Sequence, residues 1–242
     1  SYNLLTSFEV TYPRVNCSNN QISSLTISSS VIHDINCSNN LLTTIPPKTF
    51  SWTGAWTYFN CANNMISSLP AGYGDVFVLD ISNNNFTQLP ALGFNLTSFY
   101  CSGNVIDTIN IAATCPYLQT LYCSNCQLKS LGSYPGLNYL DCSNNELTYM
   151  PLMNPYLLQL NCSHNQLTSL QQSPTQVLNC SYNPINCLPV LGNYLNTLVI
   201  DSTFITCLPN IPLTLSVNYP QCNSDTLTCE TFPVISGKVF LD

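Results

Sequence analysis

Apolar and polar residues alternate in short bursts along this chain, and the same burst returns with a period near 20 residues. A representative unit spans Leu137–Leu147 and has the form L-x-x-L-x-C-x-x-N-x-L. The alternation over Leu140–Cys142 predicts a short strand with one buried and one exposed side. Between strands the chain carries apolar–proline pairs such as Met150-Pro151, and proline disfavours helix there because it lacks a backbone donor.

One asparagine position follows each expected strand and marks the units, with Cys126 and Thr203 in its place in two of them. Its amide can satisfy backbone groups of the neighbouring turn that would otherwise be buried without a partner. We expect an α/β-type repeat that is mostly β, a solenoid of about ten units of 18–24 residues with a parallel sheet on its concave face. The convex side should be extended or 3-10, with few or no α-helices. The ten marker positions are Asn20, Asn40, Asn64, Asn84, Asn104, Cys126, Asn145, Asn165, Asn183 and Thr203.

The repeat ends near residue 209, and the residues that follow no longer fit it. We assign residues 1–209 to the solenoid with an N-terminal lead-in. Residues 210–231 are assigned to a C-terminal cap, because the apolar face of the last coil has to be covered. The longest insertion, 46–55, should bulge out between the second and third units.

Cysteine is abundant, with 14 residues, and eight of them fall on a single repeat position. A disulfide framework would not place cysteines at one phase of a repeat, so we interpret these eight as small buried residues with free thiols. Near the C-terminus, Cys222–Cys229 is the first disulfide that we expect, and Cys187–Cys207 is a further option. The eight repeat cysteines are Cys17, Cys37, Cys61, Cys101, Cys123, Cys142, Cys162 and Cys180.

Charged residues make up only 6% of the chain, against about a quarter in a typical domain, and the formal net charge is -7. Only four residues are basic, so no basic surface exists to hold nucleic acid or an anionic membrane. No apolar run is long enough to span a bilayer, which argues against membrane insertion. A surface built from amides, hydroxyls and tyrosine suits an extracellular protein.

Strand residues that point outward form the candidate binding face. They fall in two rows, one immediately before each repeat cysteine and one two residues earlier. Aromatic rings gather near the middle beside two aspartates, and such rings can stack on sugars or anchor a protein ligand. Two other interpretations remain open: tyrosine is common on any exposed sheet, and the asparagines could form a ladder that stiffens it. The candidate residues are Tyr58, Phe77, Asp80, Tyr100, Tyr122, Tyr139 and Asp141.

We expect no enzyme activity, no cofactor and no metal site. A catalytic site needs a nucleophile or a general base with a partner, and the two histidines, His33 and His164, lie several units apart. The C-x-x-C of Cys123 and Cys126 is of a kind that can bind zinc or undergo redox chemistry. Both cysteines fall on inward-facing positions, however, and no second pair lies nearby in the sequence.

These units resemble the leucine-rich repeat and, more narrowly, the secreted leucine-rich repeat proteins of Bacteroidota, whose units run L-x-x-L-x-C-S-x-N-x-L-T-x-L-P. Leu157–Leu170 is close to that consensus. Cys-Leu-Pro at 207–209 and Tyr-Pro-Gln-Cys at 219–222 resemble the end of that family's arrays. Residues 235–242 resemble the first strand of the B-type immunoglobulin-like repeats of bacterial adhesins. Residues 232–242 would then be a linker and the start of a following domain.

The resemblance implies a longer, multidomain protein that is extracellular or held at the cell surface and exported by the type IX system. It also implies O-glycosylation at Asp-Ser/Thr-aliphatic motifs. The candidate acceptors are Thr108, Ser202 and Thr226.

Together these patterns indicate a non-catalytic extracellular recognition or adhesion module that binds protein or glycan through the concave face. The alternative is a structural subunit of an extracellular filament or surface layer, which the low charge and many amides also fit. Self-association could then use the solenoid ends or the C-terminal strand, by strand addition. Ice binding by flat rows of Asn, Thr and Ser is a third option.

Overall fold

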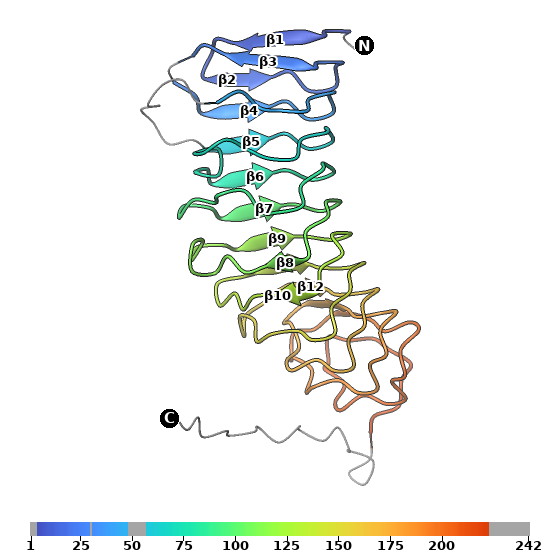
Figure 1. The fold of residues 1–242 in the computed structure, drawn as a ribbon. Coiled ribbons are helices and arrows are strands. Elements are labelled where there is room, and N and C mark those ends of the chain that lie inside the picture. Colours follow the sequence, from blue (N-terminus) through green and yellow to red (C-terminus); the bar gives the residue numbers. More distant parts are fainter. Residues whose placement is uncertain (1–3, 30, 48–56, 223–242) are drawn as a thin grey trace, which may run out of the picture.

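The computed structural model describes residues 4–29, 31–47 and 57–222. Within these ranges the chain forms strands and no helix, and the expected extended convex side is confirmed. Ten strands make one parallel sheet whose order follows the chain, so each coil adds one strand to the stack (Figure 1). The ten are β2 (Arg14–Asn16), β4 (Asp34–Asn36), β5 (Tyr58–Asn60), β6 (Val78–Asp80), β7 (Ser98–Tyr100), β9 (Thr120–Tyr122), β11 (Tyr139–Asp141), β12 (Gln159–Asn161), β13 (Val177–Asn179) and β14 (Thr197–Val199).

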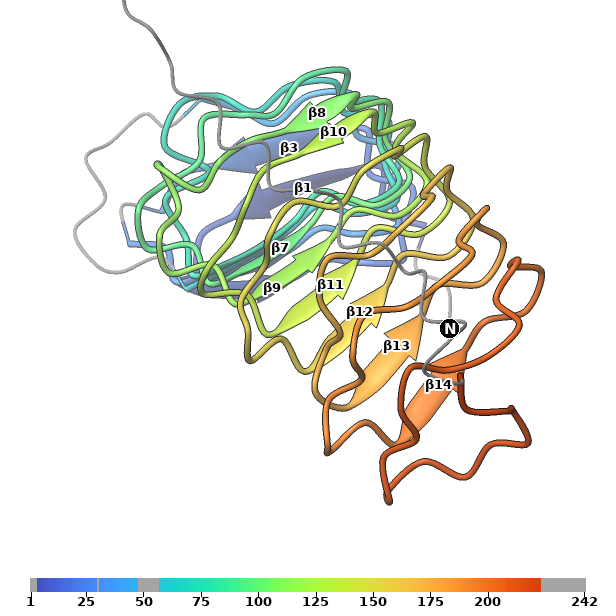
Figure 2. The same cartoon turned by 90° about the horizontal axis from the view of Figure 1, so that it is seen from below.

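The opposite side of the solenoid carries two short parallel pairs that the repeat pattern does not predict. One joins β1 (Ser7–Val10) to β3 (Ser24–Ile27), and the other joins β8 (Thr108–Ile109) to β10 (Ser130–Leu131). Figure 2 shows both pairs across the core from the ten-stranded sheet. The N-terminal lead-in is therefore a return segment that covers the first coil.

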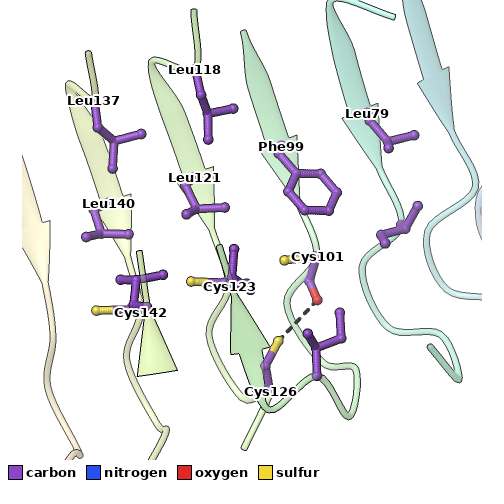
Figure 3. Packing of buried hydrophobic residues seen from close by; sticks show 14 of the residues in the cluster. Leu79, Phe99, Cys101, Leu118, Leu121, Cys123, Cys126, Leu137, Leu140 and Cys142 are labelled. Carbon is purple, nitrogen blue, oxygen red and sulfur yellow. Dashed lines mark hydrogen bonds between the residues drawn. The ribbon is translucent and has the colours of Figure 1, made fainter. Parts of the chain in front are cut away.

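The core runs along the inside of the stack between these two sides. The middle residue of nearly every strand in the sheet is buried, while its two neighbours are half-buried or exposed, as the alternation predicts. Phe99, Leu121 and Leu140 lie side by side on adjacent strands, and Cys101, Cys123 and Cys142 form the next layer (Figure 3). The eight repeat cysteines are free and buried, so the expected thiol ladder is confirmed.

The marker asparagines join each coil to the one before it. The Nδ2 group of Asn165 donates to the carbonyl oxygens of Cys162 and Ser163 in its own coil, at 3.1 and 3.2 Å. It also donates to Cys142 O of the preceding coil at 3.0 Å, and its Oδ1 accepts the N–H of Leu147 at 3.0 Å. Buried backbone groups that no strand partner reaches are thereby paired. The predicted role of the marker is confirmed.

The residue before each marker has a left-handed backbone. Its φ lies between 51 and 70° in all ten coils. Asparagine and glycine adopt this conformation at the lowest cost, which explains why half of the units carry an Asn doublet. The first asparagine makes the turn and the second one makes the hydrogen bonds. His164, Tyr182 and Ser202 occupy the turn position in three late coils.

Gly74 is a point of close approach between two return segments and allows a direct test of the stacking. A Cβ at this position would lie 2.0 Å from the carbonyl oxygen of Ala91 and 2.9 Å from Leu92 Cα. We expect Gly74→Ala to lower the free energy of unfolding by about 1–3 kcal/mol, because the backbones must move apart. Gly136→Ala is the matched control, since a Cβ at this position would lie 3.5 Å from the nearest neighbouring atom, the carbonyl oxygen of Leu118. Urea denaturation should separate the two variants, and equal midpoints would contradict the close approach.

The C-terminal end of the solenoid corrects the expected disulfides. Cys207 is bonded to Cys222, with Cα atoms 5.0 Å apart, so neither Cys222–Cys229 nor Cys187–Cys207 forms. Cys187 is disulfide-bonded as well. The cause is spatial: the segment after the last coil turns back, and Leu208 N donates to Pro220 O at 2.9 Å, which places Cys222 beside Cys207.

Several sequence-based predictions fall outside the described residues. They include residues 232–242 with their expected strand, Cys229 and the O-glycosylation candidate Thr226. Most of the insertion at 46–55 lies outside as well.

Candidate functional site

The exposed face of the ten-stranded sheet consists of the two expected rows. Register is maintained along the whole sheet, so Asn60, Asp80, Tyr100, Tyr122 and Asp141 are direct neighbours on successive strands. We call this line, with its equivalents in the other coils, the outer row. The second row, two residues earlier on each strand, is in register in the same way.

Most residues of the outer row stabilise the turn that follows their strand. At seven positions an Asn or Asp side-chain oxygen accepts the backbone N–H two residues later, at 2.9 to 3.3 Å. This Asx turn bends the chain out of the strand toward the marker asparagine. The main role of these seven residues is therefore to shape their own coils, and one bond between row neighbours, from Asn161 Nδ2 to Asp141 Oδ2, fits the ladder considered from the sequence. The seven are Asn16, Asn36, Asn60, Asp80, Asp141, Asn161 and Asn179.

Tyr100 and Tyr122 interrupt this series in two adjacent coils. A tyrosine cannot make the Asx turn, and in the coil of Tyr122 the N–H of Ser124 donates instead to Ser102 Oγ of the preceding coil, at 3.1 Å. The two rings pack edge to face, with centroids 5.2 Å apart and planes at 89°. Tyr122 keeps 38% of its surface exposed. Tyr100 is half-buried, so the pair replaces two structural residues with an aromatic corner that is partly exposed.

Further groups surround Tyr122. Partial burial raises the pKa of Tyr122, and Tyr100, Asp141 and Tyr139 add to the shift because they disfavour a phenolate beside them. The hydroxyl therefore stays protonated at neutral pH and can act as a hydrogen-bond donor. The structure brings four of the seven candidate residues into one cluster. We call Tyr100, Tyr122, Tyr139 and Asp141 the tyrosine cluster.

The other three candidates occupy different places. Asp80 lies next to Tyr100 in the outer row and borders the tyrosine cluster. Tyr58 lies on β5, two strands from Tyr100 and in the second row, where its hydroxyl accepts a hydrogen bond from Asn60 Nδ2 at 2.9 Å. Phe77 precedes β6 at the edge of the sheet and lies outside both rows. Sequence spacing alone did not distinguish these positions, because they all fall near the strands.

The buried thiols are part of the scaffold. Burial raises the pKa of Cys17 to about 11 and that of Cys180 to about 12, so both remain protonated at neutral pH. In the C-x-x-C pair, Cys123 and Cys126 are both fully buried. The Cys126 thiol takes the place of a marker amide and donates to Cys101 O at 3.2 Å. Reactive cysteines are partly exposed, whereas Cys123 and Cys126 are both buried.

Two further aromatic pairs were not anticipated from the sequence. Phe94 and Tyr117 pack edge to face at 5.1 Å in the loops that lead into β7 and β9. His164 and Tyr182 stack with centroids 4.1 Å apart at the left-handed turn positions of adjacent coils. Both pairs come from residues one coil apart, so comparing equivalent positions in neighbouring units could have revealed them.

Within the described residues, no three His, Cys, Asp or Glu side chains converge in a way that could hold a metal ion. The same residues contain no helix that is long and apolar enough to cross a bilayer.

No protein-family model and no curated protein sequence matches the chain. Among solved structures, YopM from Yersinia enterocolitica is similar at 26% identity and a TM-score of 0.66, over 90% of this chain and 54% of that one. YopM from Yersinia pestis, described as a leucine-rich effector protein, gives a TM-score of 0.73 at 24% identity, over 88% and 67%. The protein has a leucine-rich repeat fold. Its predicted fold class is thereby confirmed.

Two other solved structures are similar to the chain in fold. The functional domain of InlJ from Listeria monocytogenes, which includes a cysteine ladder, is 20% identical with a TM-score of 0.56, over 84% of this chain and 59% of that one. A chain of the Toll–Spätzle complex from Drosophila is 21% identical with a TM-score of 0.63, over 81% and 35%. The leucine-rich repeats of this chain thus span about half of the first YopM chain and about a third of the Toll–Spätzle chain.

Proposed function

We propose that this leucine-rich repeat chain is a non-catalytic recognition module that binds a protein through the tyrosine cluster. The carrying observation is that two adjacent coils give up the Asx turn, which seven other coils keep, for a pair of tyrosines, one exposed and one half-buried. Exposed tyrosines are frequent anchors of protein interfaces because they bury a large ring and still offer a hydroxyl. Toll–Spätzle, a structure with the same fold, is a protein complex.

A cross-linking experiment tests this proposal. A photoreactive benzoyl-phenylalanine replaces Tyr122 in one sample and Tyr149 in another, and each is exposed to surface extracts of the organism that carries the gene. Tyr149 is 55% exposed and lies outside the sheet, so it serves as the matched control. We expect a discrete cross-linked protein from position 122 that is absent at position 149 and is lost when Tyr100 is also changed to Ala. Equal labelling at both positions would contradict binding through the cluster.

A glycan is the second ligand class that the same rings could hold, because sugars stack on exposed aromatic faces. Glycan-array binding by the unmodified chain, abolished by Tyr100→Ala with Tyr122→Ala, would favour it over a protein. The O-glycosylation candidates Thr108 and Ser202 are both exposed and remain candidates for modification of the module itself.

We further propose that the module works outside the cell, at the cell surface or in the extracellular medium. The Cys207–Cys222 disulfide supports this placement, because such bonds persist in oxidising compartments. The low content of charged residues agrees with it.

Assembly into a filament or surface layer is a second candidate function, and one observation favours it. The sheet ends at β2 and β14, and each end strand has a sheet partner on one side only. At the β2 end, Asn20 Oδ1 is buried without a hydrogen-bond partner among the described residues, whereas the equivalent oxygen of Asn40 accepts Ile22 N–H. A further coil stacked end to end would supply that donor. Filaments in electron micrographs of the purified chain would support this candidate.

A further inference from the structure

We propose that the protein partner presents a basic side chain, lysine or arginine, to the Tyr100–Tyr122 pair. This inference rests on the proposed function and specifies the chemistry of the contact. It is carried by the order of residues along the outer row and by the charge of the exposed face.

The tyrosine pair lies between two carboxylates. Asp80, Tyr100, Tyr122 and Asp141 are in register on the consecutive strands β6, β7, β9 and β11. Strands in a sheet are about 4.8 Å apart, so the two aspartates are separated by about 14 Å with both rings between them. No other part of the outer row places aromatic residues between acids.

The edge-to-face packing suits a cation. Because the ring planes meet at 89°, the edge of one ring lies against the other and the pair forms a corner rather than a closed stack. The face of an aromatic ring is electron-rich and attracts lysine or arginine, most strongly where other charges assist. A basic side chain that contacts either ring would also lie within one strand spacing of a carboxylate.

Both aspartates can still accept hydrogen bonds. Asp80 uses Oδ1 for the Ser82 N–H at 3.0 Å, and no described residue donates to its Oδ2. Asp141 Oδ1 accepts a hydrogen bond from the Ser143 N–H at 3.0 Å, and its Oδ2 accepts one from Asn161 Nδ2 at 3.2 Å. A neutral amide donor leaves the negative charge of Asp141 in place. Each carboxylate can therefore attract a cation without giving up its turn.

Among the residues that the structure describes, no basic side chain lies beside these two carboxylates. Arg14 is the one basic residue among the strands of the ten-stranded sheet, and it lies three strands from β6 in an ion pair with Asp34 at 3.1 Å. Lys129 lies next to β10, on the opposite side of the solenoid. The whole chain has a net charge of -7, which favours basic partners and disfavours acidic ones.

The test uses a fluorescent synthetic peptide that alternates lysine with glycine, and a matched peptide with glutamine in place of lysine. Asp80→Asn with Asp141→Asn removes both charges and keeps the Asx turns, because Asn occupies the same position in Asn16, Asn36 and Asn60. The control variant, Glu146→Gln with Asp201→Asn, removes the same number of charges away from the outer row. Affinity is measured by fluorescence anisotropy.

We expect the lysine peptide to bind and the glutamine peptide to bind at least about ten-fold more weakly. The Asp80/Asp141 variant should lose about ten-fold in affinity and the control variant less than about two-fold. Changing Tyr100 and Tyr122 to Leu should also lower the affinity for the lysine peptide. Equal binding of both peptides, or equal losses in the two charge variants, would overturn the inference. A partner cross-linked at position 122 would still support the proposed function in that case.

Discussion

Asn145→Ala is expected to lower the free energy of unfolding by about 4 kcal/mol or more. The Asn145 amide donates to three carbonyl oxygens in two coils, at 2.9 to 3.1 Å. Its Oδ1 accepts the N–H groups of Cys126 and Leu128 at 2.9 and 3.0 Å. Alanine would leave these backbone groups buried without partners, at about 1–3 kcal/mol for each group that water cannot reach. Urea denaturation followed by circular dichroism measures the loss.

The neighbouring residue provides the control for this prediction. Asn144 has φ of 55° and is exposed, so its task is to make the turn. Gly103 fills the same position in the fifth coil with φ of 70°. Asn144→Gly should therefore change stability by no more than about 1 kcal/mol. Similar losses in both variants would show that the marker amide is not what joins the coils.

Alkaline pH is expected to unfold the whole solenoid. Burial raises the pKa of all eight ladder thiols above the ordinary value of 9.0. Since the folded-state pKa values are raised, the unfolded chain loses these protons first as the pH rises. The contribution of the buried thiols to the free energy of unfolding is fully present below pH 9. It is lost above pH 9, by up to about 1.4 kcal/mol per pH unit for each thiol. Eight thiols together should unfold the chain within about two pH units above 9.

Thiolate absorbance and circular dichroism, recorded together along a pH titration, measure this transition. Thiolate should appear together with the loss of sheet signal. Changing Cys142, Cys162 and Cys180 to Ala removes three of the eight groups. The slope of unfolding free energy against pH above 9 should then fall by about three eighths. Gradual thiolate formation near pH 9 with the sheet intact would mean that the ladder is accessible to solvent.

The repeat pattern was sufficient to predict the sheet, because each strand pairs with the equivalent strands of the repeats before and after it. Leu140 therefore packs between Leu121 and Leu160, as their equivalent positions require. The return side could not be predicted in this way. Its residues differ from coil to coil, and the pairing of β8 with β10 depends on how much chain each coil uses to return.

The candidate site was predicted in part. The sequence places Tyr100, Tyr122 and Asp141 on one line, and the structure keeps them together. The sequence does not show that most other residues of this line form Asx turns, because the hydrogen bond from the backbone to the side chain depends on the local bend of the chain. The disulfide between Cys207 and Cys222 was missed for a related reason: it joins the last coil to a segment that does not repeat.

The Cys126 substitution has a mechanical consequence for the stack. At seven junctions a marker amide donates to the preceding coil, but at the fifth junction the donor is a thiol, which is a weaker donor, and at the ninth Thr203 Oγ1 donates only within its own coil. A chain held at its two ends and pulled would yield first where the connection between coils is weakest. One of the two weakened junctions lies between β7 and β9, the two strands that carry Tyr100 and Tyr122. Tension that opens this junction would separate the tyrosine pair and release whatever it holds.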